Sequence, residues 1–183
     1  MPLVFTTSYI EDARAIFRQC KKLADGALAQ VADVDLTRTL DPEMNSIAII
    51  MKHMAGNMLS RWTDFLTTDG EKPTRNRDSE FEDPPATRAG LTALWERGWS
   101  CLSDALEPLA ESDLLRTVTI RGEAHSVMQA INRQVAHYSY HCGQIVLLAK
   151  HFQSSEWKCL SVPRKQSAEF NRRVLAGEAS QRN

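Results

Sequence analysis

Apolar residues recur at intervals of three and four along four stretches of the chain, which predicts four amphipathic helices. The stretches cover about residues 8–31, 46–66, 85–109 and 126–152. Ser8 with Glu11, and Ser126 with Gln129, have the spacing of a capping box, which marks a helix start. Each helix would be roughly 30–40 Å long at about 1.5 Å per residue. Four helices of similar length predict an all-α protein built as a four-helix bundle.

The connections between these helices differ in character. Arg116–Arg121 is a β-branched, alternating run that ends at Gly122, and it predicts a short extended or hairpin segment. Thr67–Pro84 is polar, acidic and long enough to run back along the bundle, so the second and third helices can be parallel. We expect its acidic run, Asp78–Asp83, to be solvated, with a loop folded over a pocket mouth as the alternative.

The domain organisation follows from length and composition. A chain of 183 residues predicts one domain, which we place at residues 1–163. Residues 164–183 contain a basic cluster and little to bury, so we expect a partly ordered C-terminal tail there. The basic residues of this tail are Arg164, Lys165, Arg172 and Arg173.

Charge and cysteine content exclude several classes of function. The chain has 22 Lys+Arg against 23 Asp+Glu, so no overall field attracts nucleic acid or anionic lipid. The longest apolar runs are far shorter than the ~20 residues that cross a bilayer, and Met1–Ile10 lacks the features of a secretory signal. The four cysteines form no CxxC pair and are typical of reduced thiols. We therefore expect a cytoplasmic protein that acts on a small molecule, with neither nucleic acid nor membrane as a partner.

The histidines are the strongest candidates for chemistry. His137 and His141 lie four residues apart on the fourth predicted helix, so their imidazoles share one face and can bind one metal ion. His53 lies on the second predicted helix, at the edge of its apolar stripe. If these two helices are antiparallel, all three rings lie at a similar height in the bundle. The open alternative is that the histidines are packing residues of a bare helical bundle.

These residues also carry a resemblance. One His on the second helix, followed by His-x3-His and Gly-Gln on the fourth, is similar to the pattern of the DinB-like superfamily of four-helix bundles. Three segments more narrowly resemble a branch of that superfamily known as a domain of unknown function, DUF1572. The three segments are Gly56–Pro73, His137–Gln144 and Ser161–Asn171.

The resemblance implies a fold, a metal and a kind of chemistry. The fold is an up-down-down-up bundle, and the ligand positions of the superfamily fall on His53, His137 and His141. Zinc or nickel is the metal in relatives. Some members of the superfamily transfer a low-molecular-weight thiol (bacillithiol, mycothiol or glutathione) to a small electrophile. Apart from the resemblance, exposed apolar faces of such bundles can form homodimers, although the sequence identifies no interface.

A divalent ion on three histidines keeps positions open and lowers the pKa of a thiol or water that binds there. Hydrolysis also needs a carboxylate base, and we expect no acidic residue beside the three histidines. We therefore favour thiol transfer, with a non-catalytic bundle that binds a metal or a small ligand as the alternative. The catalytic residues are unknown. Residues that could orient substrate or ligands are Asn57, Arg61, Tyr138 and Gln144.

Overall fold

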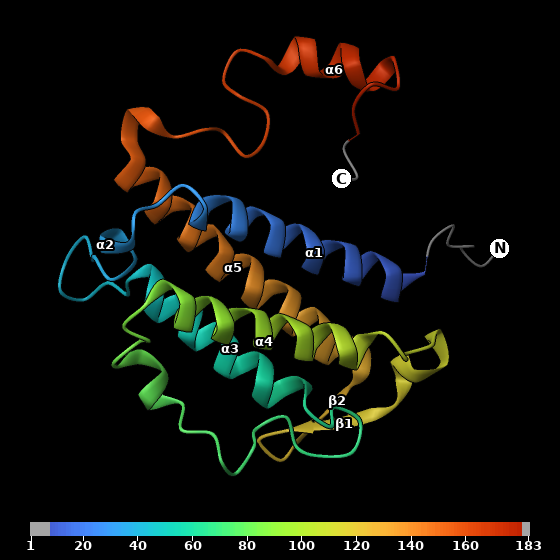
Figure 1. Ribbon diagram of the computed structural model, residues 1–183. Coiled ribbons are helices and arrows are strands. Elements are labelled where there is room, and N and C mark those ends of the chain that lie inside the picture. Colours follow the sequence, from blue (N-terminus) through green and yellow to red (C-terminus); the bar gives the residue numbers. More distant parts are fainter. Residues whose placement is uncertain (1–7, 181–183) are drawn as a thin grey trace.

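The computed structural model describes residues 8–180, and they are mostly helical (Figure 1), so the prediction of an all-α protein is confirmed. Four long helices lie alongside one another in the figure. They are α1 (Tyr9–Leu28), α3 (Ile47–Trp62), α4 (Arg88–Leu106) and α5 (Val127–Gln153).

Each long helix begins at a hydroxyl residue. The side-chain oxygens of Ser8, Ser46, Thr87 and Ser126 each accept a hydrogen bond from the backbone N–H three residues later. These bonds satisfy N–H groups that the first helical turn leaves without a partner. The end of α3 differs from the prediction: the helix ends at Trp62 rather than near residue 66, because Thr63 is extended and Asp64 has a φ of 46°.

The shorter elements lie in the connections. β1 (Thr117–Ile120) pairs with β2 (Glu123–Ser126) in an antiparallel hairpin, which confirms the predicted hairpin segment. Arg121 and Gly122 form its turn, and both have positive φ. The remaining short helices are α2 (Asp33–Leu36), η1 (Asp78–Phe81), η2 (Glu111–Leu115) and η3 (Ser154–Glu156).

Contacts between side chains give the relative directions of the helices. The Tyr9 hydroxyl donates to Asn132 Oδ1 (2.6 Å), and Cys20 Sγ lies 3.4 Å from Ser139 Oγ, so α1 and α5 run in the same direction. His53 of α3 instead lies beside His141, so α3 runs opposite to α5, with Trp62 near Gln134 at the other end.

Aromatic rings fill the centre between the four helices. Tyr138 of α5 has no exposed surface, and its ring centroid lies 5.7 Å from that of Phe17 and 5.9 Å from that of Trp99. Trp62 of α3 makes a T-shaped contact with Phe17, with ring centroids 6.2 Å apart. Four long helices thus meet around one aromatic centre, which holds α5 and its histidines in place.

The chain after α5 first returns to α1, where Gln30 forms hydrogen bonds with the Lys158 backbone and Leu160 lies against Gly26. α6 (Ser167–Leu175) has no buried residue and lies apart from the long helices in Figure 1. The division into residues 1–163 and 164–183 stays a prediction, and its outer ends, residues 1–7 and 181–183, lie outside the described residues. Among residues 8–180, no helix has both the length and the apolar character needed to cross a membrane.

Candidate metal centre

The side chains of His53, His137 and His141 meet between α3 and α5. His137 Nε2 lies 3.3 Å from His53 Nε2 and 3.1 Å from His141 Nε2. Within residues 8–180 this is the group of His, Cys, Asp or Glu side chains arranged to hold a metal ion. His53 and His141 are buried, and His137 is partly exposed. The structure therefore brings together all three histidines that the sequence singles out.

The orientation of His53 is set by a carboxylate. Glu80 Oε2 accepts a hydrogen bond from His53 Nδ1 (2.8 Å), and Phe81 stacks on the imidazole with ring centroids 4.7 Å apart. An imidazole that donates from Nδ1 in its neutral form keeps a lone pair on Nε2. The Nε2 of His53 is thus an acceptor or a metal ligand.

Glu80 corrects two expectations from the sequence. We expected no acidic residue beside the three histidines, and we expected the Asp78–Asp83 run to be solvated. Both predictions are wrong for Glu80, because its carboxylate contacts His53 and the residue is only 6% exposed. The loop after α3 folds back onto the helix, and η1 places the carboxylate against His53. Sequence periodicity does not report such a contact, because the path of a loop depends on distant partners.

Arg75 secures Glu80 in this position. Its guanidinium donates from Nε to Glu80 Oε1 (2.7 Å) and from Nη2 to Glu80 Oε2 (2.9 Å), a bidentate ion pair. Burial raises the pKa of Glu80, but the hydrogen bonds from His53 and Arg75 and the charge of Arg75 outweigh it, so its pKa is lowered. Glu80 is therefore ionised at neutral pH.

Arg61 belongs to the same polar network, one step further from the histidines. Arg61 Nη1 and Arg75 Nη1 both donate to Glu71 Oε2, over 2.9 and 3.0 Å, and Arg61 also donates to the Gly70 carbonyl. Burial lowers the pKa of Arg61, with the Glu71 carboxylate acting in the opposite direction. Hydrogen bonds through Glu71, Arg75 and Glu80 thus connect Arg61 to His53. Sequence reasoning missed those three residues, since their only signal was the mixture of opposite charges in the loop.

His141 is oriented in the same way as His53. Its Nδ1 lies 2.8 Å from Gln144 Oε1, one turn further along α5. Since an amide oxygen only accepts, the hydrogen is on Nδ1 and the lone pair is on Nε2. Gln144 therefore contacts a site histidine directly, and the exposed Tyr140 ring lies against His141 at a centroid distance of 4.9 Å.

His137 has a different environment. Its Nδ1 is buried and has no hydrogen-bond partner among the described residues. Burial, followed by the charges of His141 and His53, lowers the pKa of His137 to about 3. This imidazole is therefore neutral at physiological pH, the form in which histidine binds metals.

Asn57 and Tyr138 are close to the site but do not bind its histidines. The Tyr138 hydroxyl donates to Asn57 Oδ1 (3.0 Å) and accepts from Trp62 Nε1 (3.0 Å). The Tyr138 ring packs beside His137, with centroids 5.5 Å apart. Within the described part of the chain, both residues support the core behind the site rather than the ligand nitrogens.

The three nitrogens suit a divalent transition metal. Tetrahedral ligands about 2.0–2.1 Å from a zinc ion lie roughly 3.3–3.4 Å from one another. The two separations that involve His137, 3.1 and 3.3 Å, are close to that spacing, and all three ligand atoms lie within 4.8 Å of one another. Neutral imidazoles are ligands that zinc and nickel both accept. The residues present therefore fit such an ion.

The fold and the site define the class of this protein. It is mostly helical, and the side chains of three histidines converge at one point. The family model described as "Protein of unknown function (DUF1572)" matches residues 4–166, and the chain belongs to that family. No curated protein matches the chain, and no solved structure matches it.

Proposed function

We propose that this protein is a divalent-metal-dependent enzyme whose ion, zinc or nickel, is bound by the Nε2 atoms of His53, His137 and His141. One observation carries the proposal. Glu80 accepts a hydrogen bond from Nδ1 of His53, and Gln144 accepts one from Nδ1 of His141, so the Nε2 lone pairs of both rings face His137. Hydrogen bonds that fix the tautomer of a ligand are a general feature of histidine metal sites.

The electrostatics of the cluster support a cation at its centre. In the neutral forms of His53 and His141, with Nδ1 donating to Glu80 and Gln144, both Nε2 atoms are acceptors and neither can donate to the other. A single hydrogen on His137 Nε2 can satisfy only part of this arrangement, at 3.1 and 3.3 Å from the two acceptors. A cation would interact favourably with all three lone pairs, whereas packing histidines have no reason to direct them at one point.

The arrangement of the helices supports the proposed superfamily. We infer that the four long helices make the up-down-down-up bundle of the DinB-like proteins. In support, α1 runs with α5, and α3 runs against α5. Cys101 of α4 lies near both Met58 and Thr63, at the end of α3, and Gly98 packs near Ala55 one turn earlier, as expected for parallel α3 and α4.

For the reaction, we favour thiol transfer to a small electrophile over hydrolysis. A bound divalent ion would lower the pKa of a thiol. The Glu80 carboxylate does not change this ranking, because it lies at Nδ1 of His53, on the far side of the ring from Nε2, and Arg75 occupies both of its oxygens. Its role in this proposal is to hold His53 in orientation rather than to remove a proton from water.

Metal analysis of protein purified without a histidine tag tests the proposal. The expected result is about one equivalent of zinc or nickel per chain. We expect His53→Ala and His137→Ala to lose it and His151→Ala, on the exposed end of α5, to retain it. Metal-free protein that cannot be reloaded would contradict the proposal and favour histidines that only pack.

Catalysis needs a separate experiment. A panel of thiols with monochlorobimane as the electrophile should show a rate above background that disappears with a chelator and returns with metal. A metal-loaded protein without any such rate would support the alternative, a non-catalytic bundle that binds a metal or a small ligand.

A further inference from the structure

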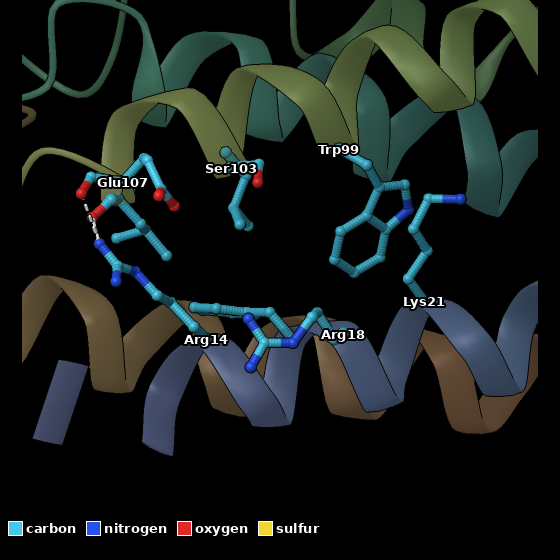
Figure 2. Close-up of a pocket in the computed structure, with 9 residues that line it drawn as sticks. Arg14, Arg18, Lys21, Trp99, Ser103 and Glu107 are labelled. Carbon is cyan, nitrogen blue, oxygen red and sulfur yellow. Dashed lines mark hydrogen bonds between the residues drawn. The ribbon is translucent and has the colours of Figure 1, made fainter. Parts of the chain in front are cut away.

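A cavity of about 490 Å³ lies between α1, α5 and the segment that follows α5. It is on the far side of α1 from the pocket in Figure 2, where Arg14, Arg18 and Lys21 rise toward α4. Three of the four cysteines of the chain line this cavity. The surface around them is mostly apolar and includes Ile16, Leu23, Val146, Trp157 and Leu160.

Two of these cysteines, Cys20 of α1 and Cys142 of α5, contact each other. The Cys142 thiol donates a hydrogen bond to Cys20 Sγ. Cys20 Sγ also lies 3.4 Å from the hydroxyl oxygen of Ser139, one turn before Cys142 on α5. Both cysteines are buried, with 8% and 3% of their surface exposed. The packing of α1 on α5 thus brings together two thiols that are far apart in the chain.

The cavity gives a small molecule access to this pair from the Cys20 side. Ser139, the neighbour of Cys20 Sγ, is exposed and lines the cavity. Gly143, next to Cys142, also lines it, and no atom lies within 4 Å of the position of its Cβ. The missing side chain therefore leaves the surface open beside the two thiols. Cys159, the third cysteine of the lining, is exposed.

Hydrogen bonds make Cys20 the more reactive thiol of the pair. The hydrogen bond from Cys142 has the largest effect; burial opposes it and the hydrogen bond from Ser139 adds to it, so the pKa of Cys20 is lowered to about 6. The thiolate, not the thiol, is the nucleophile in the reactions of cysteine. Cys20 is therefore largely ionised at neutral pH, with a second thiol directly beside it.

We propose that Cys20 and Cys142 are a redox-active dithiol that reduces an organic hydroperoxide and forms a disulfide between α1 and α5. In the first step, Cys20 Sγ attacks the terminal oxygen of the hydroperoxide, and the O–O bond breaks. The alkoxide leaves and takes up the proton that Cys20 had released to solvent, and Cys20 becomes a sulfenic acid. In the second step, Cys142 Sγ attacks the Cys20 sulfur, the S–S bond forms and the S–O bond breaks. The hydroxide leaves with the Cys142 proton as water. Two thiols are thus oxidised to a disulfide, and the hydroperoxide is reduced to an alcohol and water.

The surroundings of the pair support both the product and the substrate. A sulfenic acid beside a thiol condenses to a disulfide, whereas an isolated one is open to further oxidation. Transient disulfides of this kind occur in proteins whose thiols are otherwise kept reduced. The apolar lining favours an organic hydroperoxide over hydrogen peroxide, because the hydrocarbon part can be buried there. The site has no residue in common with the three histidines, so either proposal can fail without the other.

Peptide mapping of the full chain tests the site. The reduced protein is treated with one equivalent of tert-butyl hydroperoxide, free thiols are blocked with N-ethylmaleimide, and the peptides are identified by mass spectrometry. We expect a disulfide between Cys20 and Cys142 that dithiothreitol reverses, with Cys101 and Cys159 alkylated. Oxidation that begins at Cys159, or a Cys20 that is alkylated like the other cysteines, would overturn the proposal.

Matched serine variants separate the roles of the two thiols. Cys142→Ser should stop the reaction at a Cys20 sulfenic acid, which dimedone traps. Cys20→Ser should leave Cys142 reduced and slow the consumption of hydroperoxide about tenfold or more, because the thiolate is lost. Cys101→Ser, in α4 and outside the lining of the cavity, should form the disulfide as the unchanged protein does. A Cys20→Ser variant that consumes hydroperoxide at the unchanged rate would contradict a nucleophile at this position.

Discussion

Gly56 lies directly against the Glu80 carboxylate: a Cβ atom at position 56 would be 2.5 Å from Glu80 Oε1. Gly56 is one turn after His53 on the same helix, so the missing side chain makes room for the carboxylate that orients the imidazole. A glycine inside a helix normally costs about 0.5–1 kcal/mol relative to alanine. At this position, the glycine allows Glu80 to reach His53.

Replacing Gly56 by alanine should therefore weaken the metal site. Helix propensity alone predicts a more stable protein, but the new methyl group would push Glu80 away from Arg75 and His53. We expect metal affinity to fall about tenfold or more, as for other losses of a ligand's hydrogen-bond partner. Competition with a chromophoric chelator measures this affinity.

Gly143→Ala is the matched control for that substitution. Gly143 lies inside α5, and no atom comes within 4 Å of the position of its Cβ. Metal affinity should stay the same, and stability should rise by up to about 1 kcal/mol. Tighter metal binding in Gly56→Ala than in the unchanged protein would show that the Glu80 contact does not support the site.

Glu80→Gln tests the carboxylate itself. The amide can still accept from His53 Nδ1, but it cannot maintain the bidentate ion pair with Arg75. We expect a loss of metal affinity of about 10- to 100-fold. Glu82→Gln, on an exposed residue of the same loop, should have no effect. If both variants bind metal as the unchanged protein does, the orienting role of Glu80 is wrong.

Tyr138→Phe separates the core from the metal site. The substitution leaves the Trp62 N–H and the Asn57 oxygen without their buried partner, which should lower the free energy of unfolding by about 1–3 kcal/mol. Metal affinity should stay within about twofold, since this hydroxyl does not contact a ligand nitrogen. Tyr140→Phe, at a position 63% exposed, should change neither quantity. Denaturant unfolding and chelator competition together measure both effects.

Asp69 provides a prediction for pH. Its carboxylate accepts from the backbone N–H groups of Glu71, Arg121 and Gly122, and so connects the loop before Arg75 to the hairpin turn. These hydrogen bonds, from Glu71 and Gly122 first, lower the pKa of Asp69 to about 2. A carboxyl with a lowered pKa in the folded state contributes stability above its unfolded pKa, about 3.9, and loses it as the pH falls toward the folded value.

The corresponding variant is Asp69→Asn. At neutral pH, it should be less stable than the unchanged protein by about 1 kcal/mol, or roughly 2–4 °C in Tm. The difference should shrink as the pH falls from 4 toward 2. Asp104→Asn, on an exposed residue of α4, is the control. A difference that stays constant over this range would contradict the proposed hydrogen bonds to an ionised Asp69.

Local features of the sequence were sufficient for the four long helices and for the histidine pair, but not for the short helices α2 and α6. Four helices, their hydroxyl caps and the shared face of His137 and His141 depend on bonds and spacings within a few residues, so they can be read from the order of residues. The height of His53 could be estimated in the same way, because helical rise is constant. The first strand of the hairpin also followed from the alternating β-branched residues of Arg116–Arg121, whereas its partner strand, Glu123–Ser126, was not predicted.

Only the tertiary structure decided what surrounds the histidines. Glu80 and Arg75 lie in a loop without periodicity, and their positions depend on a fold-back onto α3 that no local spacing encodes. For the same reason, Arg61 pairs with Glu71, and Asn57 pairs with Tyr138 rather than with a histidine. The candidate ligand histidines could be found from spacings within a few residues of the sequence. The side chains that orient them are brought there by contacts between residues far apart in the chain. Those contacts form only when the whole core packs.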